Sequence, residues 1–464
     1  MEPLSIKEIL IATRGKLVFG RDVSFIDSIS LDSREVKAGD LFIAIKGNRF
    51  DGHNFVKDAL SKGASGIIFK KGMLSWITDI DGGHKDRFFI AVDDTINAIG
   101  EIAKYYRKRF DIPFIAVTGT CGKTTVKDMI FHLLSTKLKV LRNEGTKNNH
   151  IGLPITLFRL DNTFEAGVLE LGMNHFGEID YLTKILSPRI GIITNIGLAH
   201  LEFIKNINGV LKAKEELLKN LNEDDIAILN GDDPNLKKII NKYKFKKITF
   251  GIKDRCDFYA SQINMNKETV SFRLNRKTLF TLKLLGIHNV YNALAAIATA
   301  EALGLDVSSL KSSLESFEPL SMRMKTLNFR GMLVIDDTYN ANPFSVRNAI
   351  DVISSFNGYR KIVVFSDMLE LGRHAEQLHR EIGNYITFKK VNLLLTIGKF
   401  SKYIALGAKE AGMNTENIYN LGSKKEVVEI LNTKAKPRDI ILFKGSRLTK
   451  MEDVINCFTT SYTH

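Results

Sequence analysis

One loop of this sequence combines residue types that bind phosphate. It reads Gly-Thr-Cys-Gly-Lys-Thr-Thr over residues 119–125, between an apolar run at 114–117 and a stretch whose apolar residues recur at helical spacing. Glycines allow backbone N–H groups to turn toward an anion, and a following helix adds the positive end of its dipole. Lys123 can reach the terminal phosphates of a nucleoside triphosphate, while the hydroxyl of Thr124 or Thr125 can ligate Mg²⁺. We therefore predict an ATP-binding loop, the alternative being a glycine turn with a surface lysine.

Three residues downstream of the loop could hold a metal or handle charge, namely Glu170, His200 and Lys214. Glu170 lies in the apolar run 168–171, where a carboxylate is expected either to ligate a hard cation such as Mg²⁺ or to form a buried ion pair. His200 ends a strand-to-loop passage, where a lone histidine is either functional or structural. If residues 209–220 form a helix, Lys214 shares its apolar face, so it either snorkels to solvent or is buried with a lowered pKa. A buried, neutral lysine can take up CO₂.

These candidates must be positioned by strands and helices, and the sequence alternates the signals of both. Short apolar runs typical of buried strands recur between helical patterns, which favours an α/β fold. At roughly 150 residues per domain, the 464 residues predict three domains. A linker at 111–113 and a boundary near 316–319 give domains 1–111, 112–317 and 318–464. In the last domain, polar residues follow three predicted strands at the edge where open α/β sheets bind ligands.

Composition and charge exclude several classes of protein. Hydrophobic residues make up 44% and charged residues 25%, which is ordinary for a globular chain and unlike a disordered one. No run reaches the roughly 18–20 apolar residues that span a bilayer, and the N-terminus lacks a secretory signal. Three cysteines are too few for a disulfide framework or a four-ligand zinc site. The net charge of +14 is spread along the chain. We expect a cytoplasmic protein with no stable membrane insertion and no nucleic-acid partner.

Several motifs resemble those of one enzyme family, the Mur ligases. The phosphate loop resembles that of the Mur ligases and their folylpolyglutamate synthetase relatives, although a strict phosphate-loop pattern has glycine at the position of Val117. Segments within 32–53 resemble the UDP-sugar-binding domain of the E- and F-type enzymes. Three segments resemble the F-type specifically, namely 148–154, 336–343 and 367–372. Cys121 and Met322 depart from the family pattern, which commonly has Asn or another residue in the loop and Gly before Arg323.

This resemblance implies a fold in three parts: a mixed α/β UDP-sugar domain, a central P-loop-type ATP-binding α/β domain and a C-terminal Rossmann-like α/β domain. It also implies an ATP- and Mg²⁺-dependent ligase that joins D-Ala-D-Ala to UDP-N-acetylmuramoyl-tripeptide (UDP-MurNAc-tripeptide) in peptidoglycan precursor synthesis. Such an enzyme forms an acyl phosphate, which the amine attacks through a tetrahedral intermediate, with release of ADP and phosphate. The resemblance further implies two Mg²⁺ ions, and we expect a monomer.

The family's site residues can be carried over to matching positions of this sequence. Catalytic roles fall on Lys123, His200 and Lys214, and metal ligation falls on Thr124, Glu170, His200 and, if carbamylated, Lys214. ATP binding falls on Gly119, Thr120, Cys121, Gly122, Lys123, Thr124, Thr125, Asn289, Asn292, Arg323 and Asp337. Substrate binding falls on Ser33, Arg34, Lys46, Asp51, His53, Asn148, Asn149, Tyr339, Asn340, Asn342 and Lys444. Asn289 could instead, or in addition, cap the alanine-rich helix predicted at 289–304.

Three other functions are compatible with parts of the sequence. A neighbouring amide ligase shares the loop, but the F-type segments argue against the E-type, and the N-terminal segment argues against a folylpolyglutamate synthetase. A nucleic-acid-dependent ATPase would need a clustered basic patch with interleaved aromatic residues. A nonhydrolysing regulator would not need Glu170, His200 and Lys214 beside the loop. The sequence leaves open the third residue of the tripeptide (diaminopimelate or lysine), the carbamylation of Lys214, the oligomeric state, the source organism and the extent of domain closure.

Overall fold

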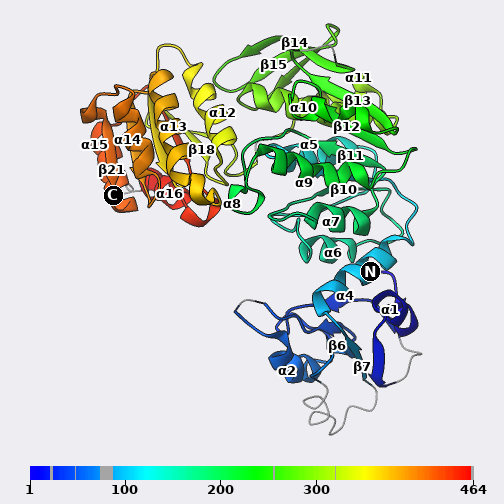
Figure 1. Cartoon of the computed structure of the whole chain (residues 1–464). Coiled ribbons are helices and arrows are strands. Elements are labelled where there is room, and N and C mark those ends of the chain that lie inside the picture. The colour runs from blue at the N-terminus through cyan, green and yellow to red at the C-terminus, as the bar shows by residue number, and fades with distance from the viewer. Residues whose placement is uncertain (21–24, 48, 74–86, 254–255, 319, 461–464) are drawn as a thin grey trace.

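The computed structural model describes residues 1–20, 25–47, 49–73, 87–253, 256–318 and 320–460. Three large sheets follow one another along the chain, each accompanied by helices (Figure 1). The predicted α/β class is therefore confirmed. None of the helices in the described ranges has the length and apolar character needed to cross a bilayer.

The first sheet has five strands in the order β2-β7-β6-β5-β4. Its strands are β2 (Lys16–Phe19), β4 (Ile29–Ser30), β5 (Leu41–Ile43), β6 (Gly66–Lys70) and β7 (Phe88–Val92), while β1 (Leu4–Ser5) pairs with β3 (Phe25–Ile26). The helices of this part are α1 (Ile6–Thr13), α2 (Val56–Ser61) and α4 (Thr95–Arg107). α1 begins at a capping box between Ser5 and Glu8, and α4 begins where the Asp94 side chain accepts the Asn97 N–H. α4 contacts both the first sheet and the central helices (Figure 1).

The central sheet has nine strands in the order β16-β15-β14-β13-β12-β11-β8-β10-β9. Its strands are β8 (Phe114–Thr118), β9 (Val140–Arg142), β10 (Ala166–Glu170), β11 (Ile190–Ile193), β12 (Ile226–Asn230), β13 (Lys246–Gly251), β14 (Phe258–Met265), β15 (Val270–Leu274) and β16 (Thr278–Leu282). Its helices are α5 (Lys123–Leu134), α6 (Gly152–Leu157), α7 (Glu178–Leu186), α8 (Leu201–Ile204), α9 (Ile207–Lys219), α10 (Ile287–Ala302) and α11 (Val307–Glu315). The strands from β8 to β14 pair in parallel, and β15 and β16 extend the sheet as antiparallel strands.

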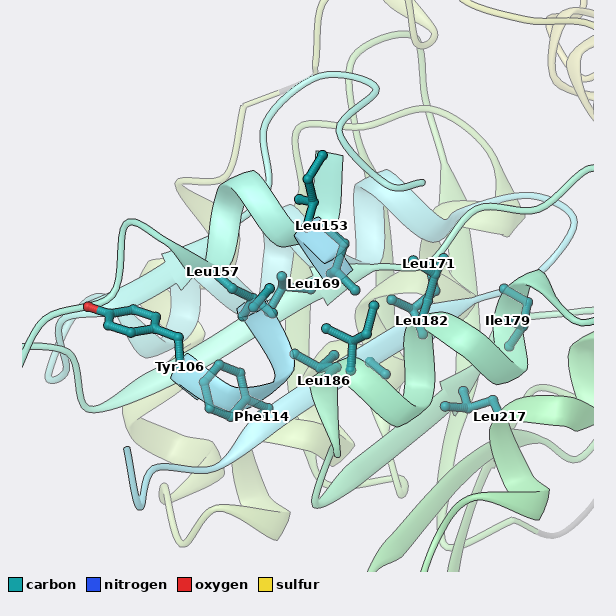
Figure 2. Close-up of a cluster of buried hydrophobic side chains, with 14 of the residues drawn as sticks. Tyr106, Phe114, Leu153, Leu157, Leu169, Leu171, Ile179, Leu182, Leu186 and Leu217 are labelled. Atoms are coloured by element: carbon teal, nitrogen blue, oxygen red, sulfur yellow. The ribbon is translucent and has the colours of Figure 1, made fainter. Parts of the chain in front are cut away.

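The central strand β8 is apolar throughout because both of its faces are buried. Phe114 and Ala116 belong to one hydrophobic cluster, and the alternate residues Ile115 and Val117 belong to another. Figure 2 shows the first cluster, in which residues of β8 and β10 meet leucines of α6 and α7. The second cluster packs the opposite face against α5 and α10. The two layers of helices hold the end of β8, and with it the phosphate loop, in a fixed place.

The third sheet has six strands in the order β17-β18-β22-β19-β20-β21. Its strands are β17 (Lys325–Phe329), β18 (Met332–Asp337), β19 (Arg360–Ser366), β20 (Leu393–Ile397), β21 (Ile418–Leu421) and β22 (Asp439–Lys444). Its helices are α12 (Pro343–Ser354), α13 (Ala375–Phe388), α14 (Lys402–Glu410), α15 (Lys424–Lys434) and α16 (Glu452–Thr460). α12, α13 and α14 cover one face, and α15 and α16 cover the other. All strands except the edge strand β17 are parallel, so their carboxyl ends meet at one edge, as predicted.

Several predicted element boundaries are wrong by a few residues. α5 begins at Lys123, so the predicted loop 119–125 ends at Gly122, whose left-handed backbone (φ 84°) precedes the helix. α9 spans Ile207–Lys219 rather than 209–220, because Asn206 caps its first turn. β18 continues through the two aspartates expected beyond it, because its ladder with β22 extends to the pair Asp337 and Lys444.

Tyr106 links the first part of the chain to the central part, and its substitution tests how much this contact stabilises the fold. Its hydroxyl donates a hydrogen bond to the carbonyl of Leu160 (2.6 Å) and accepts one from the N–H of Glu2 (2.6 Å), and its ring packs edge-on against Phe110. Tyr106→Phe leaves the buried Leu160 carbonyl and the partly buried Glu2 N–H without this partner, so we expect a loss of about 1–3 kcal/mol in the free energy of unfolding. Tyr106→Ala also opens a cavity, so its expected loss is about 3–5 kcal/mol.

Urea unfolding followed by circular dichroism measures both losses. Tyr403→Phe is the control, because the Tyr403 hydroxyl makes no hydrogen bond within the part of the chain that the structure describes. Equal midpoints for Tyr106→Phe and Tyr403→Phe would show that the Tyr106 hydroxyl does not stabilise the fold.

Candidate functional site

A cavity of about 950 Å³ lies where the carboxyl edge of the central sheet meets the C-terminal segment. Its walls come from the phosphate loop, from β10, from the start of α10 and from the strand end at β18. Predicted site residues that line it are Thr120, Cys121, Gly122, Lys123, Thr124, Thr125, Asn148, Glu170, His200, Asn289, Asn292, Arg323, Asp337, Tyr339, Asn340, Asn342 and Lys444. The structure thus brings together most of the predicted ATP and dipeptide residues, from segments more than 300 positions apart.

The phosphate loop is held from the side by the loop that follows β11. The Asn195 side chain accepts the N–H of Cys121 (3.0 Å), and the Asn195 carbonyl accepts the N–H of Thr120 (3.0 Å). Lys123 folds back so that its ammonium donates to the carbonyl of Gly119 (3.1 Å). Gly122 has no room for a side chain, because a Cβ atom there would lie 2.4 Å from the Asn292 side-chain oxygen of α10. The loop is therefore shaped before any nucleotide arrives.

Glu170 is buried at the end of β10 and lies at the centre of a polar cluster. It accepts hydrogen bonds from the Thr124 hydroxyl (2.6 Å) and the Asn148 amide (2.8 Å). The Arg323 guanidinium donates to the same Thr124 hydroxyl (2.8 Å). Burial opposes ionisation of Glu170, but Lys123, the Thr124 hydrogen bond and Arg323 outweigh it, so its pKa lies below the usual value. Glu170 is therefore a carboxylate at neutral pH, and a cation can replace the contacts that neutralise it.

The oxygen donors of this cluster fit a magnesium ion. Mg²⁺ takes hard oxygen ligands, usually one or two carboxylates together with substrate phosphates and waters. Glu170 and Thr124 supply two such oxygens next to the phosphate loop. Within the described ranges, no group of three His, Cys, Asp or Glu residues could hold a metal by itself. Glu170 and Thr124 therefore form part of a cation site that further ligands would complete.

Lys214 is buried on the apolar face of α9, as its spacing predicts. Only 2% of the residue is exposed, so the snorkelling interpretation is wrong. Loss of solvation and the charge of Lys123 lower its pKa well below the usual value, while Cys121 and Glu170 act in the opposite direction. No hydrogen bond or ion pair joins its ammonium to the described residues. Lys214 does not itself line the cavity wall, and neither does Gly119.

His200 meets a residue of the C-terminal sheet's loops that the sequence analysis did not assign a role. Its Nδ1 atom lies 2.7 Å from the Oε2 atom of Glu370, at ion-pair distance but without the angle of a hydrogen bond. The histidine lowers the pKa of Glu370 through this contact. Glu370 lies in the segment 367–372, so the motif was visible in the sequence, whereas its partner was not.

Asn289 and Asn292 are both buried on the first turns of α10. The Asn292 amide donates to the Asn289 side-chain oxygen (2.9 Å), and the Asn289 amide donates to the carbonyl of Leu285 (2.8 Å). The expected capping role of Asn289 is wrong, because the helix starts earlier and Gly286 occupies the N-cap position. One contact nearby was not predicted: the Tyr291 hydroxyl donates to Asp232 (2.7 Å) across the cavity wall.

The C-terminal residues of the cavity are tied to one another and to the phosphate loop. Arg323 lies over the Tyr339 ring, 3.9 Å from its centroid. The Lys444 ammonium is buried and pairs with Asp337 (2.5 Å), so two residues predicted to bind different ligands form one ion pair. Lys444 also donates to the carbonyl of Asn340 (2.9 Å). Asn342 caps α12 and contacts the Cys121 sulfur across the boundary between the two segments.

The predicted residues for the UDP-sugar lie apart from this cavity. None of Ser33, Arg34, Lys46, Asp51 and His53 lines it. The His53 ring is buried, with Nδ1 against Asp51 (2.6 Å) and Nε2 accepting the N–H of Lys70 (3.1 Å). Both of its nitrogens are therefore engaged in holding the loop between Lys46 and Asp51.

Ser33, Arg34 and Asn149 are the other predicted substrate residues outside the large cavity. Arg34 is exposed and pairs with Asp32 (2.6 Å), whereas the buried Ser33 accepts the Lys62 ammonium at its carbonyl (2.9 Å). Asn149 lines a second, smaller cavity of about 340 Å³ beside α7.

Comparisons with known proteins agree along the whole chain. Family models match residues 25–107 (Mur ligase family, catalytic domain), 117–300 (Mur ligase middle domain) and 322–447 (Mur ligase, glutamate ligase domain). A UDP-N-acetylmuramoyl-tripeptide–D-alanyl-D-alanine ligase of Bacillus subtilis is 34% identical over 455 residues, which is 97% of each chain. MurF from Acinetobacter baumannii superposes with a TM-score of 0.89 at 30% identity, covering 99% of both chains. MurF ligase from Thermotoga maritima in complex with ADP gives a TM-score of 0.83 at 28% identity, covering 93% of this chain and 97% of that one.

Gly122→Ala tests whether the shape of the loop matters for nucleotide binding. The added methyl group meets the Asn292 side chain and also requires a left-handed backbone, so we expect the Kd for ATP to rise by about tenfold or more. Isothermal titration with ATP and Mg²⁺ measures the change.

Gly304→Ala is a matched control for the backbone cost. Gly304 has nearly the same φ (83° against 84°), but nothing lies within 4 Å of its added methyl group. We expect its Kd for ATP to match that of the unmodified protein. An equal rise in both variants would mean that a left-handed alanine weakens binding by destabilising the protein as a whole, and not through the contact between α10 and the loop.

Proposed function

Since the chain belongs to the Mur ligase family, we propose that it is an ATP-dependent ligase that joins D-Ala-D-Ala to UDP-MurNAc-tripeptide in peptidoglycan precursor synthesis. The observation that carries this proposal is that the phosphate loop and residues of the segment 336–343 line the same cavity. The similarity to tripeptide–D-alanyl-D-alanine ligases over nearly the full chain supports the same reaction.

ATP binds with its phosphates at the loop before α5. Backbone N–H groups of the loop and the positive end of the α5 dipole receive the phosphates. Lys123 exchanges the Gly119 carbonyl for phosphate oxygens, and Arg323 approaches them from the other wall. Asn289 and Asn292 contact the nucleotide from the start of α10, and Asp337 contacts it from the C-terminal wall. The ADP complex of the T. maritima relative supports ATP as the nucleotide.

Thr124, Glu170 and His200 would hold magnesium, and Lys214, if carbamylated, would provide a further carboxylate for a second ion. Bound Mg²⁺ neutralises phosphate charge and polarises the phosphoryl oxygens. The low pKa of Glu170 keeps it ionised as a ligand. The low pKa of Lys214 supplies the neutral amine that reacts with CO₂, and its full burial protects the product from water.

The reaction first brings the carboxylate of the tripeptide to the terminal phosphate of ATP, and an amine reacts in the second step. The carboxylate of the tripeptide attacks the terminal phosphoryl group of ATP, and ADP leaves. The amine of D-Ala-D-Ala then attacks the acyl phosphate, and the tetrahedral intermediate loses a proton and expels inorganic phosphate to leave the amide. Cations on both walls, Lys123 and Arg323, lower the repulsion between carboxylate and phosphate. Tyr339, Asn340, Asn342 and Lys444 present the dipeptide from the C-terminal wall. Closure of the two walls excludes water, which would otherwise hydrolyse the acyl phosphate.

The N-terminal part binds the UDP-sugar end of the other substrate. Ser33, Arg34, Lys46, Asp51 and His53 lie there, and Asn148 and Asn149 follow on the central part. We place the domain boundaries at 111/112 and 317/318, close to the limits of the matched family models. Under this proposal the enzyme is a cytoplasmic monomer, because the residues assigned to ATP, to magnesium and to both substrates all lie on one chain.

Phosphate release from ATP and Mg²⁺ tests the reaction directly. We expect release only when UDP-MurNAc-tripeptide and D-Ala-D-Ala are both present, since the acyl phosphate needs the first and its productive breakdown needs the second. Tripeptides with diaminopimelate or lysine at the third position then reveal which one this enzyme uses. Release with UDP-MurNAc-dipeptide and a free diamino acid would instead identify an E-type ligase, and no release with either pair would contradict the proposal.

Lys214→Met tests the carbamate. Methionine fills the buried space without a reactive amine, so we expect kcat to fall by about two orders of magnitude or more while ATP still binds. In the unmodified protein, ¹³C-labelled bicarbonate should give a carbamate NMR signal that is absent from Lys214→Met. The control Lys127→Met removes another buried lysine, whose ammonium donates to the Asn143 carbonyl and which keeps the signal under this prediction. A signal of equal strength in Lys214→Met would place the carbamate elsewhere.

A further inference from the structure

The segment 367–372 has no role in the proposed reaction so far, yet it is where the C-terminal part contacts His200. Its first residue has a structural role, because the Asp367 carboxylate accepts the backbone N–H groups of Lys399, Phe400 and Ser401. Glu370 belongs to the same segment. Its side chain is 44% exposed, and its carboxylate points at the His200 ring. The buried Asp367 therefore anchors the segment 367–372, and this segment places Glu370 next to His200.

Both residues of this contact have an unusual backbone conformation. His200 (φ 53°) and Glu370 (φ 63°) each adopt the left-handed conformation, which is uncommon for residues other than glycine. Such conformations persist where the surrounding structure determines them, and they concentrate at functional sites. Here two of them face each other across the boundary between the central and C-terminal parts. The side chains of His200 and Glu370 are aimed at one another by this geometry.

The short helix after His200 is docked onto the C-terminal part. The Glu202 N–H donates to the Glu370 carbonyl (3.1 Å), and Gly372 approaches so closely that a Cβ atom there would lie 3.0 Å from the Glu202 Cα. Leu201 is buried in the same hydrophobic cluster as Met368 and Leu371 of the C-terminal part. Figure 1 shows α8 between the C-terminal helices and α9. The position of His200 therefore depends on the C-terminal part as well as on the central sheet.

We propose that Glu370 is a positioning residue that orients the His200 ring through Nδ1 and makes the placement of His200 depend on docking of the C-terminal part. This inference rests on the proposed function for its activity readout. A carboxylate that accepts the N–H of one ring nitrogen fixes the tautomer and leaves the other nitrogen, Nε2, with a free lone pair, and His200 lines the cavity. The 2.7 Å contact lacks hydrogen-bond alignment in this structure, and such contacts commonly align when substrates bind.

Two substitutions at one position separate orientation from simple packing. Glu370→Ala removes the acceptor, so we expect kcat to fall roughly 10- to 100-fold, the usual effect of losing the partner of a ligating histidine. Glu370→Gln keeps an oxygen that can accept from Nδ1, so it should retain most of kcat, with the KM for ATP unchanged in both. Both variants retain a Cβ atom and so share the left-handed backbone requirement. Glu410→Ala, which breaks an ion pair with Arg380 on the surface of the same part, should leave kcat unchanged.

A spectroscopic readout does not depend on turnover. Protein labelled with ¹⁵N-histidine should show His200 as the Nδ1-protonated tautomer, assigned by its loss in His200→Gln, and Glu370→Ala should convert this signal to a mixture of tautomers. If the unmodified protein releases no phosphate with any substrate pair, the proposed function fails while this spectrum still decides the role of Glu370. Should Glu370→Ala fail to fold, the spectra of the unmodified protein and of Glu370→Gln decide it.

Three outcomes would overturn the inference. One is unchanged kcat in Glu370→Ala. Another is a His200 tautomer that is Nε2-protonated in the unmodified protein or unaffected by Glu370→Ala. The third is an equal loss of kcat and of melting temperature in the Ala and Gln variants, which would indicate packing rather than orientation.

Discussion

The charged, buried carboxylate of Glu170 is the interaction on which the arrangement of this site depends. Burial alone would favour the protonated form of Glu170, and the charge is retained because cations and donors surround it. Lys123 and Thr124 belong to the phosphate loop, but Arg323 belongs to the chain that leads into the third sheet. The charge state of a residue in the central sheet is thus linked to the position of the C-terminal part. Any movement of that part changes the neutralisation of Glu170.

Sheet topology explains how such distant residues meet. β8, β10 and β11 are adjacent parallel strands, so the phosphate loop, Glu170 and the loop holding Asn195 all emerge at one edge. The third sheet repeats this arrangement with β18, β22 and β19, which bring Asp337, Lys444 and the segment 367–372 to its own carboxyl edge. The two edges face each other across one cavity. Each edge contributes cations to the cavity, Lys123 from the central side and Arg323 and Lys444 from the C-terminal side.

Much of this site could be predicted from sequence, and the failures have identifiable physical causes. The phosphate loop, Glu170 and Lys214 carry local signals: glycines before a helix, a charge in an apolar strand and a charge on an apolar helix face. Element ends were misplaced where capping decided them, as at Asn206 and Gly286, because the competing cap residues lie within a few positions of one another. The edge strand β17 and the strands β13 to β16 follow weak alternating patterns that the sequence analysis did not use.

Contacts between distant segments had no sequence signal of their own. The pairs His200 with Glu370 and Asp337 with Lys444 join residues about 110 to 170 positions apart, and no local pattern connects the two members of either pair. A charged residue at a strand end indicates that something must neutralise it, but not whether a ligand or another side chain does so. Asp337 and Lys444 were assigned to ligands, and they neutralise each other in this structure. Spacing along a chain locates a charge, whereas only the register of β18 with β22 shows what lies opposite it.

The neighbours Asn148 and Asn149 show how one loop serves two cavities. Asn148 donates to Glu170 in the large cavity, whereas the Asn149 side chain accepts the N–H groups of Ile151 and Gly152 and so fixes the start of α6. Gly172 lines both cavities, and a side chain there would collide with Asn148. Under the proposed function, a substrate that extends from the N-terminal part to the phosphate loop would pass this loop. The hydrogen bonds of Asn149 hold the loop, and the loop places Asn148 against Glu170.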